Sequence, residues 1–118
     1  MKLIIQVPCY NEAETLAIAL GDLPRSVPGF DKVEWLIIND GSTDNTVKVA
    51  QECGVDHIVN FKHNQGLAKG FMAGITECLM QGADVIVNTD ADNQYKAKDI
   101  PKLVKPILEN RSEYVIGT

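Results

Sequence analysis

The segment WLIINDGSTDNTVKVA, residues 35–50, contains one strand-to-helix unit and indicates the fold class. Its first four residues are apolar and a polar turn follows them, which is typical of a strand buried on both faces. The apolar positions within 47–50 then indicate a helix, which we expect Ser42 or Thr43 to cap and Gly54 to end. The segment therefore predicts one repeat of a βα pattern.

The same alternation extends along the rest of the chain. Buried strands separated by single helices imply a parallel sheet, and right-handed crossovers then place helices against it. The predicted fold is α/β, a Rossmann-like, mostly parallel sheet with helices on both faces. Besides residues 35–38, strands are expected at 3–7, 57–61, 85–87 and 114–116, and helices around 12–23, 66–82 and 99–108.

The composition is that of an acidic globular protein. The 118 residues have a net charge of −5, so we expect no nucleic-acid partner, which would require a basic face. No apolar run approaches the roughly 18 residues of a membrane span, so no signal peptide or anchor is expected within these residues. Cys9, Cys53 and Cys78 are irregularly spaced, which favours reduced thiols and a cytoplasmic location.

Polar residues follow four of the predicted strands. In open parallel sheets, ligands bind in the crevice outside the carboxyl ends of the strands. Solvated loops are also polar, so each of these segments alone is weak evidence, but their convergence on one rim indicates a binding site. The segments are Pro8-Cys9-Tyr10-Asn11-Glu12, 39–44, 63–66 and 89–94.

The segment Asp90-Ala91-Asp92 indicates a metal site. Two carboxylates two residues apart on one turn repel each other, and a hard divalent cation, Mg²⁺ or Mn²⁺, removes that repulsion while it also binds a diphosphate. Gln94 offers a further neutral oxygen. The alternative is an Asx-type turn that precedes the next helix. The spacing fits neither a calcium-binding loop nor the facing carboxylates of a glycosidase.

Other turns carry further candidate ligand-binding residues. Asp40 is a candidate acceptor of hydrogen bonds from a base or ribose, and its loss should change stability little, because Ser42 and Thr43 would still cap the helix. Tyr10 could stack on a planar base. Glu12 is at the start of the first predicted helix, where the helix dipole favours a carboxylate whether or not a ligand binds.

Glycines and a lysine mark the helix expected after residue 66. Gly66, Gly70 and Gly74 recur every four residues, which predicts close packing of this helix on the sheet rather than a dinucleotide fingerprint. Lys69 is a candidate for phosphate, with a solvated surface lysine as the alternative. This helix therefore contributes only one candidate ligand-binding side chain.

The four polar segments resemble family-two glycosyltransferases of the GT-A fold. The likeness is greatest to the members that make polyprenyl-phosphate sugars, the dolichol-phosphate mannose synthases and the undecaprenyl-phosphate glycosyltransferases. The matching segments occur in the family's order and spacing and cover the whole chain. They are residues 7–12, 39–46, 64–66 and 90–94.

The resemblance implies an activity and a set of site residues. The activity is metal-dependent, inverting transfer of a sugar from a nucleoside-diphosphate sugar to an acceptor such as polyprenyl phosphate, at the inner face of the membrane. Asp90, Ala91 and Asp92 would hold the donor, and Asp92 with Gln94 and Asp90 would ligate Mg²⁺ or Mn²⁺. The remaining donor contacts would come from Pro8, Tyr10, Glu12, Asp40 and Lys69.

The resemblance also implies that residues 1–118 are the nucleotide-sugar-binding part of a longer catalytic domain, truncated at its C-terminal end. The catalytic base is expected beyond Thr118, so its identity is unknown and this chain is expected to transfer no sugar. A sheet cut short in this way exposes an edge, which predicts dimerisation or aggregation.

Two other functions remain open at this point. The chain could be a module that binds a nucleotide sugar without transferring it. It could also be a phospho-acceptor receiver domain, which needs an acid pair directly after the first strand and a lysine at the end of the fifth. Pro8-Cys9 and Gly117-Thr118 occupy those places, which argues against the receiver domain.

Overall fold

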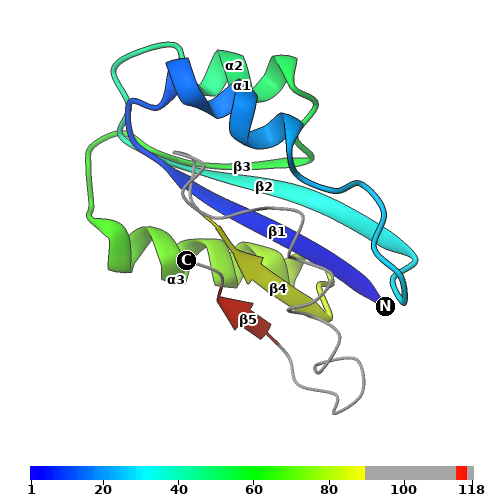
Figure 1. Cartoon of the computed structure of the whole chain (residues 1–118). Helices are drawn as coiled ribbons and strands as arrows, with labels where there is room; N and C mark the ends of the chain where they lie inside the picture. Colours follow the sequence, from blue (N-terminus) through cyan, green and yellow to red (C-terminus); the bar gives the residue numbers. More distant parts are fainter. Residues whose placement is uncertain (90–113, 117–118) are drawn as a thin grey trace.

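The computed structural model describes residues 1–89 and 114–116, which form a parallel sheet flanked by helices (Figure 1). The strands lie in the order β3-β2-β1-β4-β5, and every neighbouring pair is parallel. The elements are β1 (Lys2–Cys9), α1 (Ala13–Gly21), β2 (Lys32–Asp40), α2 (Thr46–Glu52), β3 (His57–Phe61), α3 (Leu67–Met80), β4 (Val85–Asn88) and β5 (Tyr114–Ile116).

The order in which the chain adds strands to the sheet reverses at β1, although all strands remain parallel. It first runs outward through β2 to β3, with α1 and α2 on one face, and then returns through α3 on the opposite face to β4 (Figure 1). A ligand crevice is expected at such a switch point, outside the carboxyl ends of β1 and β4. The predicted Rossmann-like α/β fold, with helices on both faces of a parallel sheet, is confirmed.

Each face of the sheet has its own hydrophobic core, because successive side chains of a strand point to opposite faces. The core under α1 and α2 contains Leu3, Ile5 and Val7 of β1 together with Leu16, Leu20 and Ala50 from the helices. The core under α3 contains Ile4, Leu36, Ile38, Cys78 and Ile86.

The glycines of α3 allow the helix to approach the sheet closely, as their spacing predicts. A Cβ on Gly74 would lie 2.5 Å from Ile38 Cδ1 and closer still to Gln6 Oε1, and a Cβ on Gly70 would lie 3.3 Å from Ile38 Cγ2. Gly66 has a different role, because it precedes the helix with a φ of 94° and has open space around its Cα. Close packing therefore explains Gly70 and Gly74 but not Gly66.

The predicted cap of the second helix is wrong. The helix begins at Thr46, with Asn45 as its cap residue, and neither Ser42 nor Thr43 caps it. Asp44 accepts a hydrogen bond from the Thr46 N–H at 3.0 Å instead. Ser42 and Thr43 bond to the turn after β1, a long-range contact that a local helix-start pattern does not reveal.

Other sequence-based expectations concern residues beyond those described. The helix predicted around residues 99–108 and the segment 90–94 lie outside residues 1–89 and 114–116. Within those two ranges, no helix has the length and apolar content that crossing a bilayer requires.

Candidate functional site

Three turns meet where the strands end at their carboxyl side. The register pairs Cys9 at the end of β1 with Asn39, and Asp40 at the end of β2 with Phe61 of β3. The turns β1–α1, β2–α2 and β3–α3 are therefore neighbours. On the other side of β1, Thr89 N donates a hydrogen bond to Gln6 O at 3.0 Å, which brings the chain after β4 to the same rim.

The β1–α1 and β2–α2 turns are joined through Asn11. Asn11 N donates to Ser42 Oγ at 3.0 Å, and Asn11 Oδ1 accepts from Thr43 N at 2.8 Å. Asn11 has a φ of 51°, and no other non-glycine residue in the described part of the chain has a positive φ. Asparagine is among the residues that tolerate this region best.

Side chains of the β2–α2 turn also satisfy the start of α1. The first N–H groups of a helix have no partner within it. Glu12 N donates to Thr46 Oγ1 at 3.0 Å, and Ala13 N donates to Asp44 Oδ2 at 3.3 Å. The pKa of Asp44 lies below its usual range, chiefly because the Thr46 hydroxyl donates to it, with further help from backbone N–H groups. Asp44 is therefore ionised and accepts the N–H groups of the first residues of both α1 and α2.

Asp40 holds the third turn. Its side chain is buried, and its two oxygens accept hydrogen bonds from Gln65 N at 2.6 Å and Gly66 N at 3.1 Å. Gly41 beside it has a φ of 78°, and a Cβ there would lie 2.5 Å from the carbonyl carbon of His63. The β2–α2 and β3–α3 turns therefore pack backbone to backbone, with Asp40 as the polar link. Within the described residues each carboxylate oxygen accepts one hydrogen bond, and a carboxylate oxygen can accept two.

The predicted donor-site residues within the described range lie at this rim. Pro8, Tyr10 and Glu12 are at the end of β1, with Tyr10 47% exposed. Lys69 is exposed in the first turn of α3. The other predicted residues, Asp90, Ala91, Asp92 and Gln94, lie outside the described residues.

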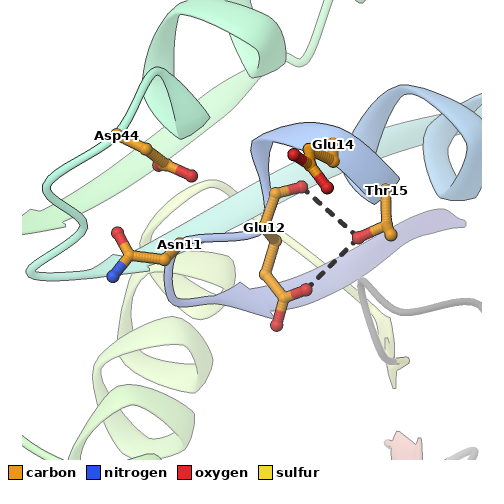
Figure 2. Close-up of a pocket in the computed structure, with 5 residues that line it drawn as sticks. All are labelled: Asn11, Glu12, Glu14, Thr15 and Asp44. Atoms are coloured by element: carbon orange, nitrogen blue, oxygen red, sulfur yellow. Dashed lines mark hydrogen bonds between the residues drawn. The ribbon is translucent and has the colours of Figure 1, made fainter.

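A surface hollow of about 320 Å³ lies beside the start of α1 (Figure 2). Of the predicted residues only Glu12 lines it, and the Glu12 carboxylate accepts a hydrogen bond from Thr15 Oγ1 at 3.2 Å. The hollow is therefore not the pocket that Tyr10 and Asp40 would form. Its lining is Asn11, Glu12, Glu14, Thr15 and Asp44.

Sequence reasoning missed the polar residues that join the turns. Asn11, Asp44 and Thr46 carried no assigned role, although an aspartate two residues before a threonine is a recognisable Asx-turn pattern. It also missed Gln6, a fully buried residue of β1 whose amide donates to Asn88 Oδ1 of β4 at 3.0 Å. A polar residue inside an apolar strand was the available signal in that case.

The Cys9 thiol at this rim is a poor candidate for a nucleophile. Cys9 is buried, and burial raises its pKa above the usual range, with a further contribution from the negative charges of Glu12 and Asp44. A neutral thiol is a poor nucleophile. Among residues 1–89 and 114–116, no group of three or more His, Cys, Asp or Glu side chains is arranged to hold a metal ion.

Comparison with known families agrees with the site's sequence motifs. A family model described as glycosyl transferase family 2 matches residues 4–118. The UDP-N-acetylglucosamine–dolichyl-phosphate N-acetylglucosaminyltransferase of Methanococcus voltae is 29% identical over an alignment of 128 positions. The alignment covers 95% of this chain and 49% of that protein. The undecaprenyl-phosphate mannosyltransferase of Micrococcus luteus is 31% identical over 123 residues, covering 100% of this chain and 48% of that protein. The chain thus spans about half the length of these relatives.

A solved structure shows the same fold. Glucosyl-3-phosphoglycerate synthase from Mycobacterium tuberculosis, in complex with Mn²⁺, uridine diphosphate and glucosyl-3-phosphoglycerate, superposes with a TM-score of 0.71 at 22% identity. The match covers 91% of this chain and 39% of that chain. At this level of identity the likeness concerns the fold.

Proposed function

The chain belongs to glycosyl transferase family 2, and from that membership we propose that it forms the nucleotide-sugar-binding part of a glycosyltransferase catalytic domain. The parent protein would transfer a sugar from a nucleoside-diphosphate sugar to polyprenyl phosphate, with inversion, at the inner face of the membrane. The names of the two relatives support this acceptor class, because they specify dolichyl phosphate and undecaprenyl phosphate.

The observation that carries the proposal is the grouping of Tyr10, Glu12 and Asp40 at the carboxyl rim, beside the switch point of the sheet. Tyr10 is about half exposed, which leaves its ring free to stack on a base. Asp40 is held in place by two backbone N–H groups and keeps acceptor capacity for a base or ribose. Pro8 would complete the pocket, and Lys69 would contact a phosphate.

We assign the divalent cation to Asp90, Asp92 and Gln94, with Ala91 between the two acids. The chemistry of this set fits Mg²⁺ or Mn²⁺, since both prefer carboxylate and amide oxygens. The bound cation would offset the charge of the departing nucleoside diphosphate. The described rim is rich in carboxylates, so it would repel a diphosphate that arrives without a cation. No residue of this chain is proposed as the catalytic base.

Calorimetric titration tests the proposal. The chain should bind uridine or guanosine diphosphate in Mn²⁺ and lose that binding in a chelator. Asp92→Ala should have the same effect as the chelator, because the cation loses an anionic ligand. Asp22→Ala, an exposed acid at the far end of α1, serves as the matched control. Equal affinity in Mn²⁺ and in chelator would refute the metal assignment.

Association through a sheet edge remains a proposal. β3 and β5 are the outermost strands of the sheet among the described residues, and the outer backbone groups of each have no strand partner there. Such an edge can pair with a second copy. Light scattering across a concentration series should show dimers or larger species, and a monodisperse monomer at all concentrations would contradict this.

A further inference from the structure

The hydrogen bonds between the β1–α1 and β2–α2 turns, which we call the turn bridge, have a consequence for ligand binding. The bridge consists of the bonds that Asn11, Glu12 and Ala13 make to residues 42–46. Its partners are 31 to 34 positions apart in the chain. The bridge is therefore a tertiary contact between the two turns and the helix starts that follow them.

Asn11 has a different position in the turn bridge from its neighbours. The start of α1 is already served by Thr46 and Asp44, which accept the N–H groups of Glu12 and Ala13. The Asn11 side chain contributes nothing to that cap. Its Oδ1 instead accepts from Thr43, through the backbone N–H at 2.8 Å and the hydroxyl at 3.3 Å. Capping of α1 consequently does not explain this side chain.

The backbone of Asn11 sets the directions of its two neighbours. Tyr10 and Glu12 flank a residue held at a φ of 51°, a region that costs a non-glycine residue free energy unless surrounding contacts enforce it. The bond to Thr43 is such a contact. A change of φ at this position would turn Tyr10 relative to Glu12.

The turn bridge also connects to Asp40. The segment that Asn11 contacts begins two residues after Asp40, and Ser42 N donates to Asn39 Oδ1 at 3.0 Å on the other side of it. Asp40 in turn holds the β3–α3 turn. The bonds of Asn11 thus link the β1 end of the rim to the β2 and β3 ends.

We propose that Asn11 is a positioning residue of the donor site, which acts through Thr43 to hold Tyr10 and Glu12 in fixed register with Asp40. This inference rests on the proposed function, in which those three residues line the nucleotide pocket. Asn11 itself need not touch the ligand. Pre-organising a pocket raises affinity because less conformational freedom is lost on binding.

Three forms of the whole chain test the inference: wild type, Asn11→Gly and Asn11→Asp. Glycine accepts the positive φ without strain but lacks Oδ1, so it removes the bonds to Thr43 and also frees the backbone at this position. Aspartate tolerates the same φ and keeps the acceptor oxygen. All are titrated with uridine and guanosine diphosphate plus Mn²⁺ in high salt, where the charge added by aspartate is screened.

Asn11→Gly should bind the nucleotide about three- to tenfold more weakly, the range expected for one hydrogen bond. Asn11→Asp should stay within about twofold of wild type by the same measure. Amide hydrogen exchange gives a second readout that does not depend on ligand. Thr43 N–H should exchange faster in Asn11→Gly than in wild type, and Asn11→Asp should resemble wild type.

The outcomes separate the inference from the function on which it rests. If wild type binds nucleotide and Asn11→Gly binds it equally well, the positioning role is wrong and the proposed function stands. The role is also wrong if both variants are equally weak, or if affinity falls while Thr43 exchange is unchanged. If wild type binds neither nucleotide, the proposed function fails and the inference fails with it.

Discussion

The two ends of the sheet both carry charged side chains, but those side chains have different partners. At the amino end, several of them bond to each other: Arg25 pairs with Asp56 at 2.7 Å, and Glu34 pairs with Lys2 at 3.3 Å and bonds to the His57 ring at 3.0 Å. At the carboxyl end, none of the acids forms an ion pair within residues 1–89 and 114–116. These acids are Glu12, Glu14, Asp40 and Asp44.

The difference indicates which end is built for a ligand. At the amino end the paired side chains satisfy each other, and Asp84 accepts a hydrogen bond from Lys2 N at 2.7 Å. Asp56 accepts from Trp35 N as well as from Arg25, whose guanidinium lies 3.5 Å from the centre of the Trp35 ring. Within the described residues, Glu12, Asp40 and Asp44 accept hydrogen bonds only from N–H and hydroxyl groups, and their negative charge remains for a cation or for ligand donors to offset.

The largest effect on stability at either end of the sheet is expected from Gly41→Ala at the carboxyl end. A Cβ would lie 2.5 Å from the carbonyl carbon of His63, on a residue with a φ of 78°. We expect a loss of about 3 kcal/mol in the free energy of unfolding, from overpacking and backbone strain together.

Gly82→Ala is the matched control for Gly41→Ala. It has a φ of 82° with nothing within 4 Å, so it should lose only about 1 kcal/mol, from backbone strain alone. Urea denaturation measures both variants. Equal losses would mean that the close contact of the two turns does not contribute to stability.

Asp40→Asn tests whether one side chain serves both stability and binding. A carboxamide has only one acceptor oxygen for the N–H groups of Gln65 and Gly66, so the variant should lose about 1–3 kcal/mol of stability. The helix-cap pattern predicts little change in stability. The structure gives the opposite expectation, because the Asp40 carboxylate itself accepts two backbone hydrogen bonds. Nucleotide affinity should fall as well.

Asp22→Asn is the exposed control for Asp40→Asn and should stay within about 0.5 kcal/mol of wild type. Urea denaturation and calorimetry are applied to both variants. Weaker nucleotide binding by Asp40→Asn at unchanged stability would assign Asp40 to the ligand alone.

Arg25→Met addresses the amino end. It keeps an apolar stem against Trp35 but removes the guanidinium and its pair with Asp56. Because Arg25 is 43% exposed, solvent screens this pair, and we expect a loss of about 1 kcal/mol in stability. Nucleotide affinity should not change, and Arg25→Lys should show a smaller loss of stability. A change in affinity would show that the two ends are coupled.

The smallest effect is expected from pH. Burial alone would raise the pKa of Glu34, but hydrogen bonds from His57 and Lys2 outweigh it and lower the pKa below 4.5. The resulting stability is present above pH 4.5 and is lost as the pH falls through the lower folded-state value. Glu34→Gln should reduce the loss in the free energy of unfolding between pH 6 and pH 3 by about 0.5 kcal/mol, as measured by urea titrations across that range. Identical pH dependence in both proteins would contradict the assignment.

Local pattern was sufficient for the elements and the class of fold. Leu3, Ile4 and Ile5 are all fully buried, as expected for a strand with helices on both sides. The spacing of Gly70 and Gly74 correctly indicated close helix–sheet packing. Pattern failed at Ser42 and Thr43, where a local cap was expected and the partners lie 31 to 32 residues away.

The sequence by itself determined that this chain forms a parallel α/β sheet and that the polar turns after β1, β2 and β3 gather at the carboxyl ends of the strands, because hydrophobic periodicity and strand direction are local properties. Only the tertiary structure decided the order of the strands and the partners of Asn11 and Asp40. Those partners depend on the register between strands, since a hydrogen bond forms only when two groups from distant segments come within about 3 Å. No local pattern contains that distance.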